Sequence, residues 1–305
     1  MFARSAPTRQ PITETRAIKL RIFDFDNTIT KEDGVKFTKH IYKKIKKTIE
    51  EKTGLSIPLG EIIDRGLKSY HQYGHSAIGL AAHYNIPIEE LYEGYHFKKR
   101  PGINECNREH SNNLKSFCAH ALAIGEQVRN CILTHSNMDW TTRSLKFLAK
   151  QKSVKKLKEV FSEKVGNIFT AEQYRLADRL GNVTQFFKAS SFIPYWLACV
   201  RMNVDPRDCS MTEDSLRNLA IAKQLGMQTI YIHHGKPLDR LPAYVDYQIE
   251  SLAEMESIPT THNVRADDSF KQFIDTEFAK AKAFFSPQNK VRQTSDWEFA
   301  EPMVA

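Results

Sequence analysis

Short apolar runs alternate with amphipathic stretches along most of the chain. The stretch IKLRIFD (18–24) is rich in apolar residues and is typical of a buried strand. Further strand signals lie at 128–134, 227–234 and, as an edge strand, 245–252. A weaker strand signal lies at 207–214, where Asp208, Ser210 and Thr212 interrupt the apolar run. Helical patterns precede two of these strands, at 111–123 and at 215–226, where Gly226 closes the helix. Strands that alternate with helices predict an α/β fold with a doubly wound parallel sheet.

Residues 32–109 depart from this alternation, because they contain helical patterns and almost no strand signal. Apolar residues between Val35 and Ile49 fall near one face of a helix, and Gly54 follows as a stop. Further helical patterns follow at 59–67, at 77–84 and from Pro87 onward. The sequence therefore predicts an all-helical unit inserted into the α/β fold.

These patterns divide the chain into a core, an insertion and two ends. We expect a core domain built from residues 17–31 and 110–260, interrupted by a helical cap domain at 32–109. Residues 1–16 contain arginines and prolines but no apolar centre, so a disordered lead-in is expected there rather than a targeting signal. A C-terminal helix and a flexible tail are expected at 261–305.

Composition narrows the function classes. The 305 residues are 41% hydrophobic, which is enough for a sizeable core, and carry a formal net charge of +8. Much of the excess positive charge lies at helical spacing at 43–47 and 152–159, which favours solvated helix faces over nucleic-acid binding. We therefore expect no nucleic-acid partner, and the sequence holds no run of 18 apolar residues that would span a membrane.

The five cysteines form no CxxC pair, which argues against a disulfide framework and against a zinc site. Unbridged cysteines are typical of a reducing compartment, so we expect a cytoplasmic protein. Export to another cell and the oligomeric state are left open by the sequence.

Carboxylate and hydroxyl side chains gather where the predicted strands end. In open α/β sheets, ligands bind beyond the carboxyl ends of the strands. The candidates at these ends are Asp24, Asp26, Thr28, Thr134, Ser136, Glu213 and Asp214, with Lys188 placed 25 residues before Glu213. Carboxylates as close as Asp24 and Asp26 repel each other unless a cation or a substrate uses them. Together with hydroxyls and a lysine they suit a phosphoryl group and a hard cation such as Mg²⁺.

Four motifs in one order give a resemblance to the haloacid dehalogenase (HAD) superfamily of phosphohydrolases. The matching segments are DFDNT (24–28), ILTHS (132–136), Lys188 and TEDSLRNLAIAKQLGM (212–227). The resemblance covers residues 18–250, and within the insertion YHQYGHSAIGLAAHYNIPIEELY (70–92) is similar to the cap of the pyrimidine 5'-nucleotidase branch. The dehalogenase branch lacks a second aspartate at the position of Asp26, so the resemblance favours phosphate chemistry.

The resemblance implies a role for each motif residue in an Mg²⁺-dependent reaction. Asp24 would be the nucleophile that forms an aspartyl-phosphate, and Asp26 the general acid and base. Thr28 would order the loop, Thr134 would bind phosphoryl oxygens, and Lys188 would neutralise charge. The metal ligands would be the Asp24 carboxylate, the Asp26 carbonyl and Asp214, with Glu213 in or just beyond the metal shell.

Substrate contacts are expected from the second motif and from the cap. The expected residues are His135, Ser136, Tyr73 and His75. In the cap, Tyr70, His71, Tyr73 and His75 could stack on a nucleobase or hydrogen-bond to it, although aromatic residues at helical spacing more often serve as packing. The expected substrate is a small phosphorylated molecule, with a pyrimidine nucleoside 5'-monophosphate as the leading candidate.

Several alternatives stay open at this stage. Lys188 is followed by Ala189, where relatives have proline, so Lys164 is kept as a second choice for the motif lysine. Glu213 and Asp214 also suit the N-terminus of the helix that follows them. For function, the alternatives are a phosphatase for another small phosphometabolite or a phosphoprotein, a non-catalytic HAD scaffold, and nucleic-acid binding through the lysine-rich helices.

Overall fold

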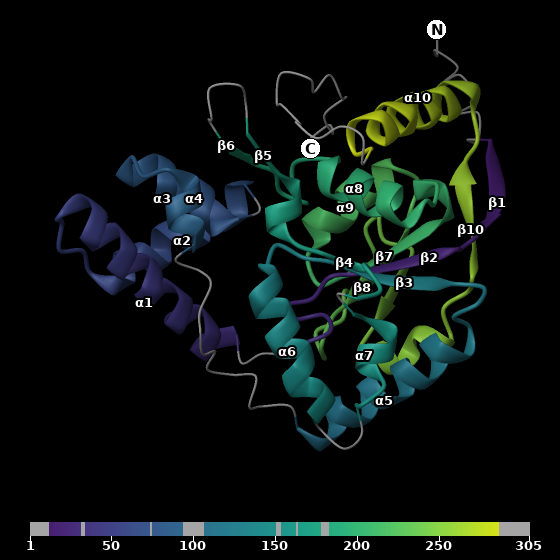
Figure 1. The fold of residues 1–305 in the computed structure, drawn as a ribbon, viewed down its shortest axis with the longest axis horizontal. Helices are drawn as coiled ribbons and strands as arrows, with labels where there is room; N and C mark the ends of the chain where they lie inside the picture. The colour runs from purple at the N-terminus through teal and green to yellow at the C-terminus, as the bar shows by residue number, and fades with distance from the viewer. Residues whose placement is uncertain are drawn as a thin grey trace, which may run out of the picture.

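A six-stranded sheet forms the centre of the protein (Figure 1). The computed structural model describes residues 12–31, 34–73, 75–93, 107–150, 154–162, 164–177 and 183–286. The strands, in spatial order, are β4 (Ile168–Phe169), β3 (Arg129–Leu133), β2 (Leu20–Phe23), β7 (Cys209–Glu213), β8 (Gln228–Ile232) and β9 (Tyr247–Ile249). Every neighbouring pair is parallel, which confirms the predicted α/β fold.

All five strands expected from the sequence are present, and β9 lies at the edge of the sheet as predicted. The polar interruptions in β7 do not weaken it, because Ser210 and Thr212 are fully buried between β2 and β8. The opposite edge strand, β4, was not predicted, since two residues are too short to give a periodic signal.

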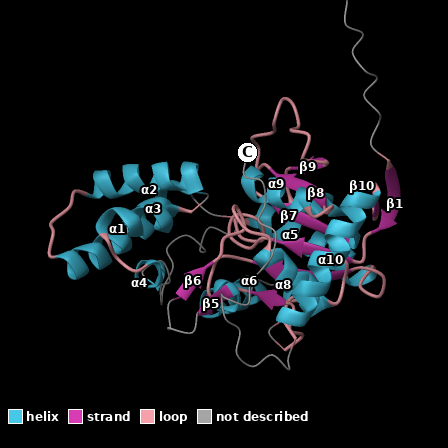
Figure 2. Cartoon of the chain, turned by 90° about the horizontal axis from the view of Figure 1, so that it is seen from above, coloured by secondary structure: helices cyan, strands magenta, loops and turns pink. Residues whose placement is uncertain are grey.

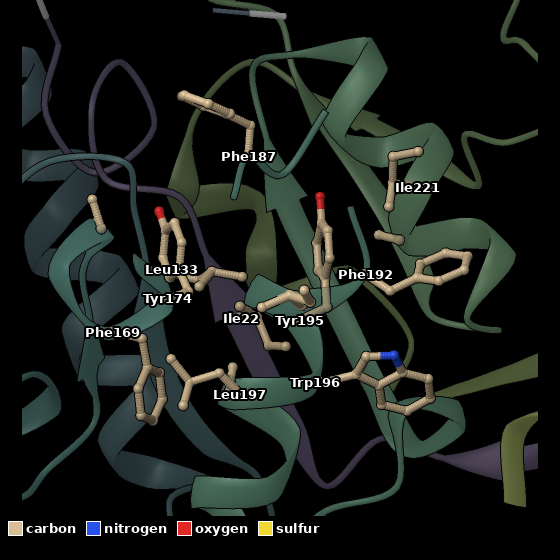
Figure 3. Packing of buried hydrophobic residues seen from close by; sticks show 14 of the residues in the cluster. Ile22, Leu133, Phe169, Tyr174, Phe187, Phe192, Tyr195, Trp196, Leu197 and Ile221 are labelled. Carbon is tan, nitrogen blue, oxygen red and sulfur yellow. The ribbon is translucent and has the colours of Figure 1, made fainter. Parts of the chain in front are cut away.

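Alternate residues of the strands point to opposite faces of the sheet, and each face carries its own hydrophobic core. Ile22, Cys131 and Met211 belong to one core, which also contains α8 (Ile193–Met202), α9 (Leu216–Gln224) and α10 (Asp268–Phe284). Figure 3 shows Ile22 and Leu133 in this core, with Tyr195, Trp196 and Leu197 of α8 packed beside them.

The other face carries the second core. Phe23, Ile132 and Ile230 belong to it, packed against α5 (Arg108–Ala123), α6 (Met138–Lys150) and α7 (Leu157–Val160). Figure 1 shows these three helices on the opposite side of the sheet from α8 and α9, so the sheet is doubly wound as expected.

Within the described residues, four helices lie in the insertion between β2 and α5, as the sequence predicts. They are α1 (Gly34–Thr53), α2 (Leu59–Tyr73), α3 (Ser76–Tyr84) and α4 (Ile88–Glu93). They group together beside the sheet (Figure 2). Gly66 allows α1 and α2 to approach closely, because a Cβ atom there would lie 2.1 Å from the ring of Tyr42. The Ser69 hydroxyl accepts a hydrogen bond from the Gly79 amide at 2.7 Å and so joins α2 to α3.

The disordered lead-in expected at residues 1–16 is wrong for its last part. Residues Thr13–Ala17 form strand β1, which pairs antiparallel with β10 (Thr261–Arg265). The two strands are about 248 residues apart, so no local sequence pattern predicts their pairing. An ion pair between Arg16 of β1 and Asp208 also holds this strand in place. Residues 1–11 of the lead-in lie outside the described residues.

Three further features complete the fold. The hairpin of β5 (Arg175–Ala177) and β6 (Val183–Gln185), which was not predicted, lies near α3 and α4 in Figure 1. Helix α10 confirms the expected C-terminal helix, whereas the tail expected after it lies outside the described residues from 287 onward. Within the described ranges, the cysteines are buried and unbridged, and no helix has both the length and the apolar composition to cross a membrane.

The buried imidazole of His110 on α5 predicts a pH-dependent loss of stability. Burial, with smaller contributions from Lys31 and His234, lowers the pKa of His110 from 6.5 to about 4. Between these values the unfolded chain binds a proton that the folded chain does not, so acidification favours unfolding. We expect His110 to lower the free energy of unfolding by about 2 kcal/mol on going from about pH 7.5 to about pH 5.

Urea unfolding of the wild type and of His110→Phe at both pH values measures this effect. The variant should lose less stability on acidification than the wild type. The same pH dependence in both proteins would show that His110 does not titrate as its burial requires.

Candidate active site

Three carboxylates meet at the carboxyl ends of two neighbouring strands. Asp24 directly follows β2, and Glu213 and Asp214 stand at the end of β7. Because β2 and β7 pair in parallel, their ends lie side by side, and the Asp24 amide donates a hydrogen bond to the Thr212 carbonyl at 3.0 Å. One carboxylate oxygen from each of the three acids lies within 4.8 Å of the others. The sequence rule for strand ends thus correctly brings these acids together.

Lys188 lies between two of these acids and is itself only 1% exposed. Its ammonium group donates hydrogen bonds to Asp24 Oδ1 at 2.5 Å and to Glu213 Oε2 at 2.7 Å. A third hydrogen bond, at 3.2 Å, reaches the carbonyl of Leu133 at the end of β3. The alternative residue, Lys164, is exposed in a turn. The structure therefore places Lys188, rather than Lys164, at the acids.

The charges of this cluster do not balance. Burial first, and the charge of Glu213 second, raise the pKa of Asp24 against the opposing effect of Lys188. Burial and the same carboxylates raise the pKa of Asp214 well above its ordinary value. Burial lowers the pKa of Lys188, but Asp24 and Glu213 outweigh it and the net shift is upward. When all three carboxylates are ionised they face one ammonium, and the two uncompensated negative charges, which the raised pKa values of Asp24 and Asp214 reflect, match a divalent cation.

The donor set also fits Mg²⁺, which prefers carboxylate oxygens and water. Asp214 is oriented by Asn27, whose side-chain amide donates to Asp214 Oδ2 at 2.7 Å. Glu213 is held by Lys188 on one oxygen and by the Ser215 amide on the other, at 3.2 Å. Because both oxygens of Glu213 already accept hydrogen bonds, Asp24 and Asp214 are the better placed residues to hold a metal ion.

Asn27 is a site residue that the sequence analysis did not single out. Its backbone has a φ of 59°, in the left-handed region where asparagine is favoured over most residues. This conformation turns the loop after β2, while the carbonyl of Asn27 contacts His234 Nε2 at 2.5 Å. The asparagine in DFDNT could have been noticed for both its turn propensity and its amide.

Thr28 lies in the same loop, as the sequence predicts, and its amide donates to the Phe25 carbonyl at 3.4 Å. Its hydroxyl is buried and has no hydrogen-bond partner among the described residues. The loop instead takes its order from backbone hydrogen bonds, in which the amides of Ile29 and Thr30 donate to the same Phe25 carbonyl at 3.0 Å.

Asp26 lies in the loop with Asp24, but its hydrogen bonds lead toward the segment after β3. The Ser136 hydroxyl donates to Asp26 Oδ2, and the Trp140 indole N–H donates to Oδ1 at 3.1 Å. Ser136 was expected to contact substrate, and in the structure its hydroxyl contacts Asp26. Trp140 was not among the predicted site residues.

Thr134 and His135 stand at the end of β3, beside Lys188. The buried Thr134 hydroxyl accepts a hydrogen bond from the Ser136 amide at 3.0 Å, and the Tyr174 hydroxyl donates to the Thr134 carbonyl at 2.6 Å. In Figure 3, the hydroxyl of Tyr174 points toward the upper end of the view, where Phe187 lies. His135 Nε2 accepts from the Lys188 amide at 3.0 Å, and burial together with the charge of Lys188 lowers the pKa of His135 well below its usual value. The His135 ring thus supports the lysine.

The helical insertion contributes residues to the same region. His75 caps α3 by accepting from the Ala77 amide at 3.1 Å, and its ring centroid lies 4.7 Å from that of Phe187 and 5.6 Å from that of His135. The insertion therefore packs an aromatic ring directly onto the residue before Lys188. His75 lies near the site, as the sequence predicts, but its ring is part of this packing.

Tyr70, rather than Tyr73, is the tyrosine of α2 that reaches the acids. Burial, followed by the charge of Asp214, raises the pKa of Tyr70, and the side chain of Ser215, next to Asp214, acts against that shift. The two tyrosines are exposed to a similar extent, Tyr70 at 43% and Tyr73 at 40%, so the influence of Asp214 on Tyr70 is what distinguishes them. Of the cap residues considered, Tyr70 and His75 are thus the two that the structure places at the site.

Comparisons with known proteins add solved structures of similar architecture. No protein-family model and no curated protein matches the chain. CbbY from Rhodobacter sphaeroides, solved with phosphate, is 16% identical and has a TM-score of 0.45, over 78% of this chain and 96% of that chain. A haloacid dehalogenase-like hydrolase from Streptococcus pneumoniae is 14% identical with a TM-score of 0.45, over 79% and 97%.

A third match is a HAD-superfamily hydrolase from Geobacter sulfurreducens, 17% identical with a TM-score of 0.39, over 79% of this chain and 96% of that chain. Identity and TM-score are low in all three comparisons. The fold and the function proposed below are therefore argued from the strand pairing and the side chains of this chain.

Proposed function

We propose that the chain is a HAD-type phosphomonoester hydrolase that depends on Mg²⁺ and works through an aspartyl-phosphate on Asp24. One observation supports this above all others: Asp24 accepts a hydrogen bond from buried Lys188 and lies with Glu213 and Asp214 in one carboxylate cluster. Phosphoryl transfer depends strongly on positioning and on neutralisation of charge. A buried ammonium and acids with excess negative charge match that need.

The proposed reaction has two steps. Asp24 attacks phosphorus, the bond from phosphorus to the leaving oxygen breaks, and the Asp26 carboxylic acid gives its proton to that oxygen. Asp26 then takes a proton from water, whose oxygen attacks phosphorus and frees Asp24. Lys188 neutralises charge on Asp24 and the phosphoryl group throughout, and Thr134 donates its hydroxyl hydrogen to a phosphoryl oxygen.

The metal would be held by the Asp24 and Asp214 carboxylates and the Asp26 carbonyl. When bound, Mg²⁺ supplies positive charge that stabilises the transferring phosphoryl group. Glu213 is proposed to support Lys188 rather than to ligate the metal, because both of its oxygens are already occupied.

The proposed substrate is a small phosphomonoester, with a pyrimidine nucleoside 5'-monophosphate as the first candidate. The resemblance of residues 70–92 to the nucleotidase cap supports this choice. The position of Tyr70 beside Ser215 also supports it, because a cap tyrosine next to the acids can contact the leaving group. We also propose the domain boundaries expected from the sequence, with the core at 17–31 and 110–260 and the cap at 32–109.

Hydrolysis of a substrate panel tests this function. The panel contains p-nitrophenyl phosphate, UMP, CMP, phosphosugars and a phosphopeptide, each with Mg²⁺ and with EDTA. We expect phosphate release with Mg²⁺, its loss with EDTA and its recovery when Mg²⁺ is restored, because the acids cannot neutralise one another.

The panel separates the alternatives. Hydrolysis of p-nitrophenyl phosphate without any preference for UMP or CMP would remove the nucleotide assignment and keep the phosphatase. No hydrolysis of any compound at neutral pH with Mg²⁺ would contradict the proposed function and favour a non-catalytic scaffold.

A further inference from the structure

The carboxylate of Asp26 is held by two donors that come from one short segment after β3. Ser136 donates its hydroxyl to Oδ2, and Trp140 donates its indole N–H to Oδ1 at 3.1 Å. Asp26 and Trp140 are 114 residues apart, so the fold brings the indole to this acid. Each oxygen of the carboxylate therefore has its own donor.

Trp140 is itself firmly placed. It lies in the first turn of α6 and is 7% exposed. It belongs to the hydrophobic core that contains Phe23 and lies between the sheet and helices α5, α6 and α7. The Asn137 side chain accepts from the Trp140 amide at 2.8 Å, and the Thr141 hydroxyl donates to the Asn137 carbonyl at 2.9 Å. These two hydrogen bonds fix the backbone at the start of α6, from which the indole of Trp140 projects.

The two donors differ in kind. An indole N–H can only donate, and its direction is set by a buried ring, whereas a serine hydroxyl rotates about its own bond. The hydrogen bond from Trp140 to Oδ1 therefore has a fixed direction. The hydrogen bond from Ser136 to Oδ2 can be broken by rotation of the hydroxyl, without movement of the backbone. This arrangement suits a general acid, because one oxygen stays fixed while the other exchanges a proton with the substrate.

We propose that Trp140 is a positioning residue for proton transfer: it holds Oδ1 of Asp26 so that Oδ2 meets the leaving oxygen. In this step the O–H bond at Oδ2 breaks and the O–H bond of the leaving alcohol forms, as the bond from phosphorus to oxygen breaks. Ser136 yields its place at Oδ2 to the leaving oxygen. The inference rests on the proposed function and adds a group that does not touch the substrate.

The dependence of rate on the leaving group tests this role. An alkyl phosphate such as glycerol phosphate needs a proton on its leaving oxygen, whereas p-nitrophenolate leaves from p-nitrophenyl phosphate without one. We expect Trp140→Phe to lower kcat/KM on the alkyl phosphate about tenfold or more. On p-nitrophenyl phosphate, kcat/KM should change by less than about threefold, because kcat/KM reports the steps through departure of the leaving group and not the hydrolysis of the aspartyl-phosphate that both substrates share. The ratio of the two rates on one preparation does not depend on the folded fraction.

Trp196→Phe is the matched control. Trp196 is also a buried tryptophan, but it packs against Phe278 on the other side of the sheet, and its indole N–H has no partner among the described residues. This variant should leave the ratio of the two rates unchanged. In an Asp26→Asn background, Trp140→Phe should likewise no longer change the ratio, because the group that it positions has lost its proton-transfer role.

Two outcomes would overturn the inference. If Trp140→Phe lowers both rates by the same factor, Trp140 is a structural residue and the proposed phosphatase function still stands. If the wild type hydrolyses neither substrate, the proposed function fails and the inference fails with it.

Discussion

Asp24→Asn is expected to abolish turnover, with a loss of roughly 10⁴-fold or more in kcat, because the amide cannot take up a phosphoryl group. The substitution keeps the size of the side chain at the end of β2. Phosphate release from the best substrate of the panel measures the loss. Mass spectrometry after rapid mixing with substrate measures the second expectation, which is that no phosphorylated enzyme forms.

The variant should remain folded. Burial and Glu213 raise the pKa of Asp24 in the folded state, so the ionised carboxylate costs stability at neutral pH. With EDTA present, Asp24→Asn should therefore unfold at the same temperature as the wild type or at a higher one. Full activity in Asp24→Asn, or in Asp24→Ala as a second variant, would remove Asp24 from the role of nucleophile.

Lys188→Met is expected to cause the largest loss of stability, together with loss of activity. Methionine fills much of the same space but leaves Asp24 and Glu213 buried without their cation. Breaking a buried ion pair on one side costs roughly 3 to 5 kcal/mol, because the partner charge stays uncompensated. Urea unfolding with EDTA present measures this cost, and Mg²⁺ should recover part of it by supplying positive charge to the same acids.

Lys223→Met is the matched control for this variant. Lys223 pairs with both oxygens of Asp246, at 2.6 and 2.8 Å, but each side chain is more than a quarter exposed. An ion pair of this kind contributes about 1 kcal/mol or less. Equal stability of the two methionine variants would show that Lys188 does not carry the charge balance of the acid cluster.

Most of the sheet was predictable because β2 and β8 are buried on both faces and therefore form clear apolar runs, whereas Ser210 and Thr212 weaken the signal of β7. The parallel arrangement then placed Asp24, Thr134 and Glu213 at one edge by a general rule. Elements that depend on distant partners escaped prediction. Strand β1 pairs with β10, which is far away in the sequence, and the hairpin of β5 and β6 is too short to show a period.

Side-chain partners were harder to predict than strand ends. Tyr70 and Tyr73 lie less than one helical turn apart on α2, and the rotation of that helix decides which of them faces Ser215. Trp140 looks like any core residue of an amphipathic helix, since one nitrogen atom alone distinguishes its role. Such contacts belong to the packing of whole elements, which the sequence pattern does not encode locally.

The place of the insertion has a consequence for how this protein can change. Strands β2 and β3 pair directly with each other, so the sheet completes its hydrogen bonds without any help from α1–α4. Under the proposed function, those helices can be lengthened, trimmed or exchanged while the acids stay where they are. A new preference for leaving groups can thus arise from mutations in one uninterrupted stretch of sequence, with the reaction itself inherited unaltered.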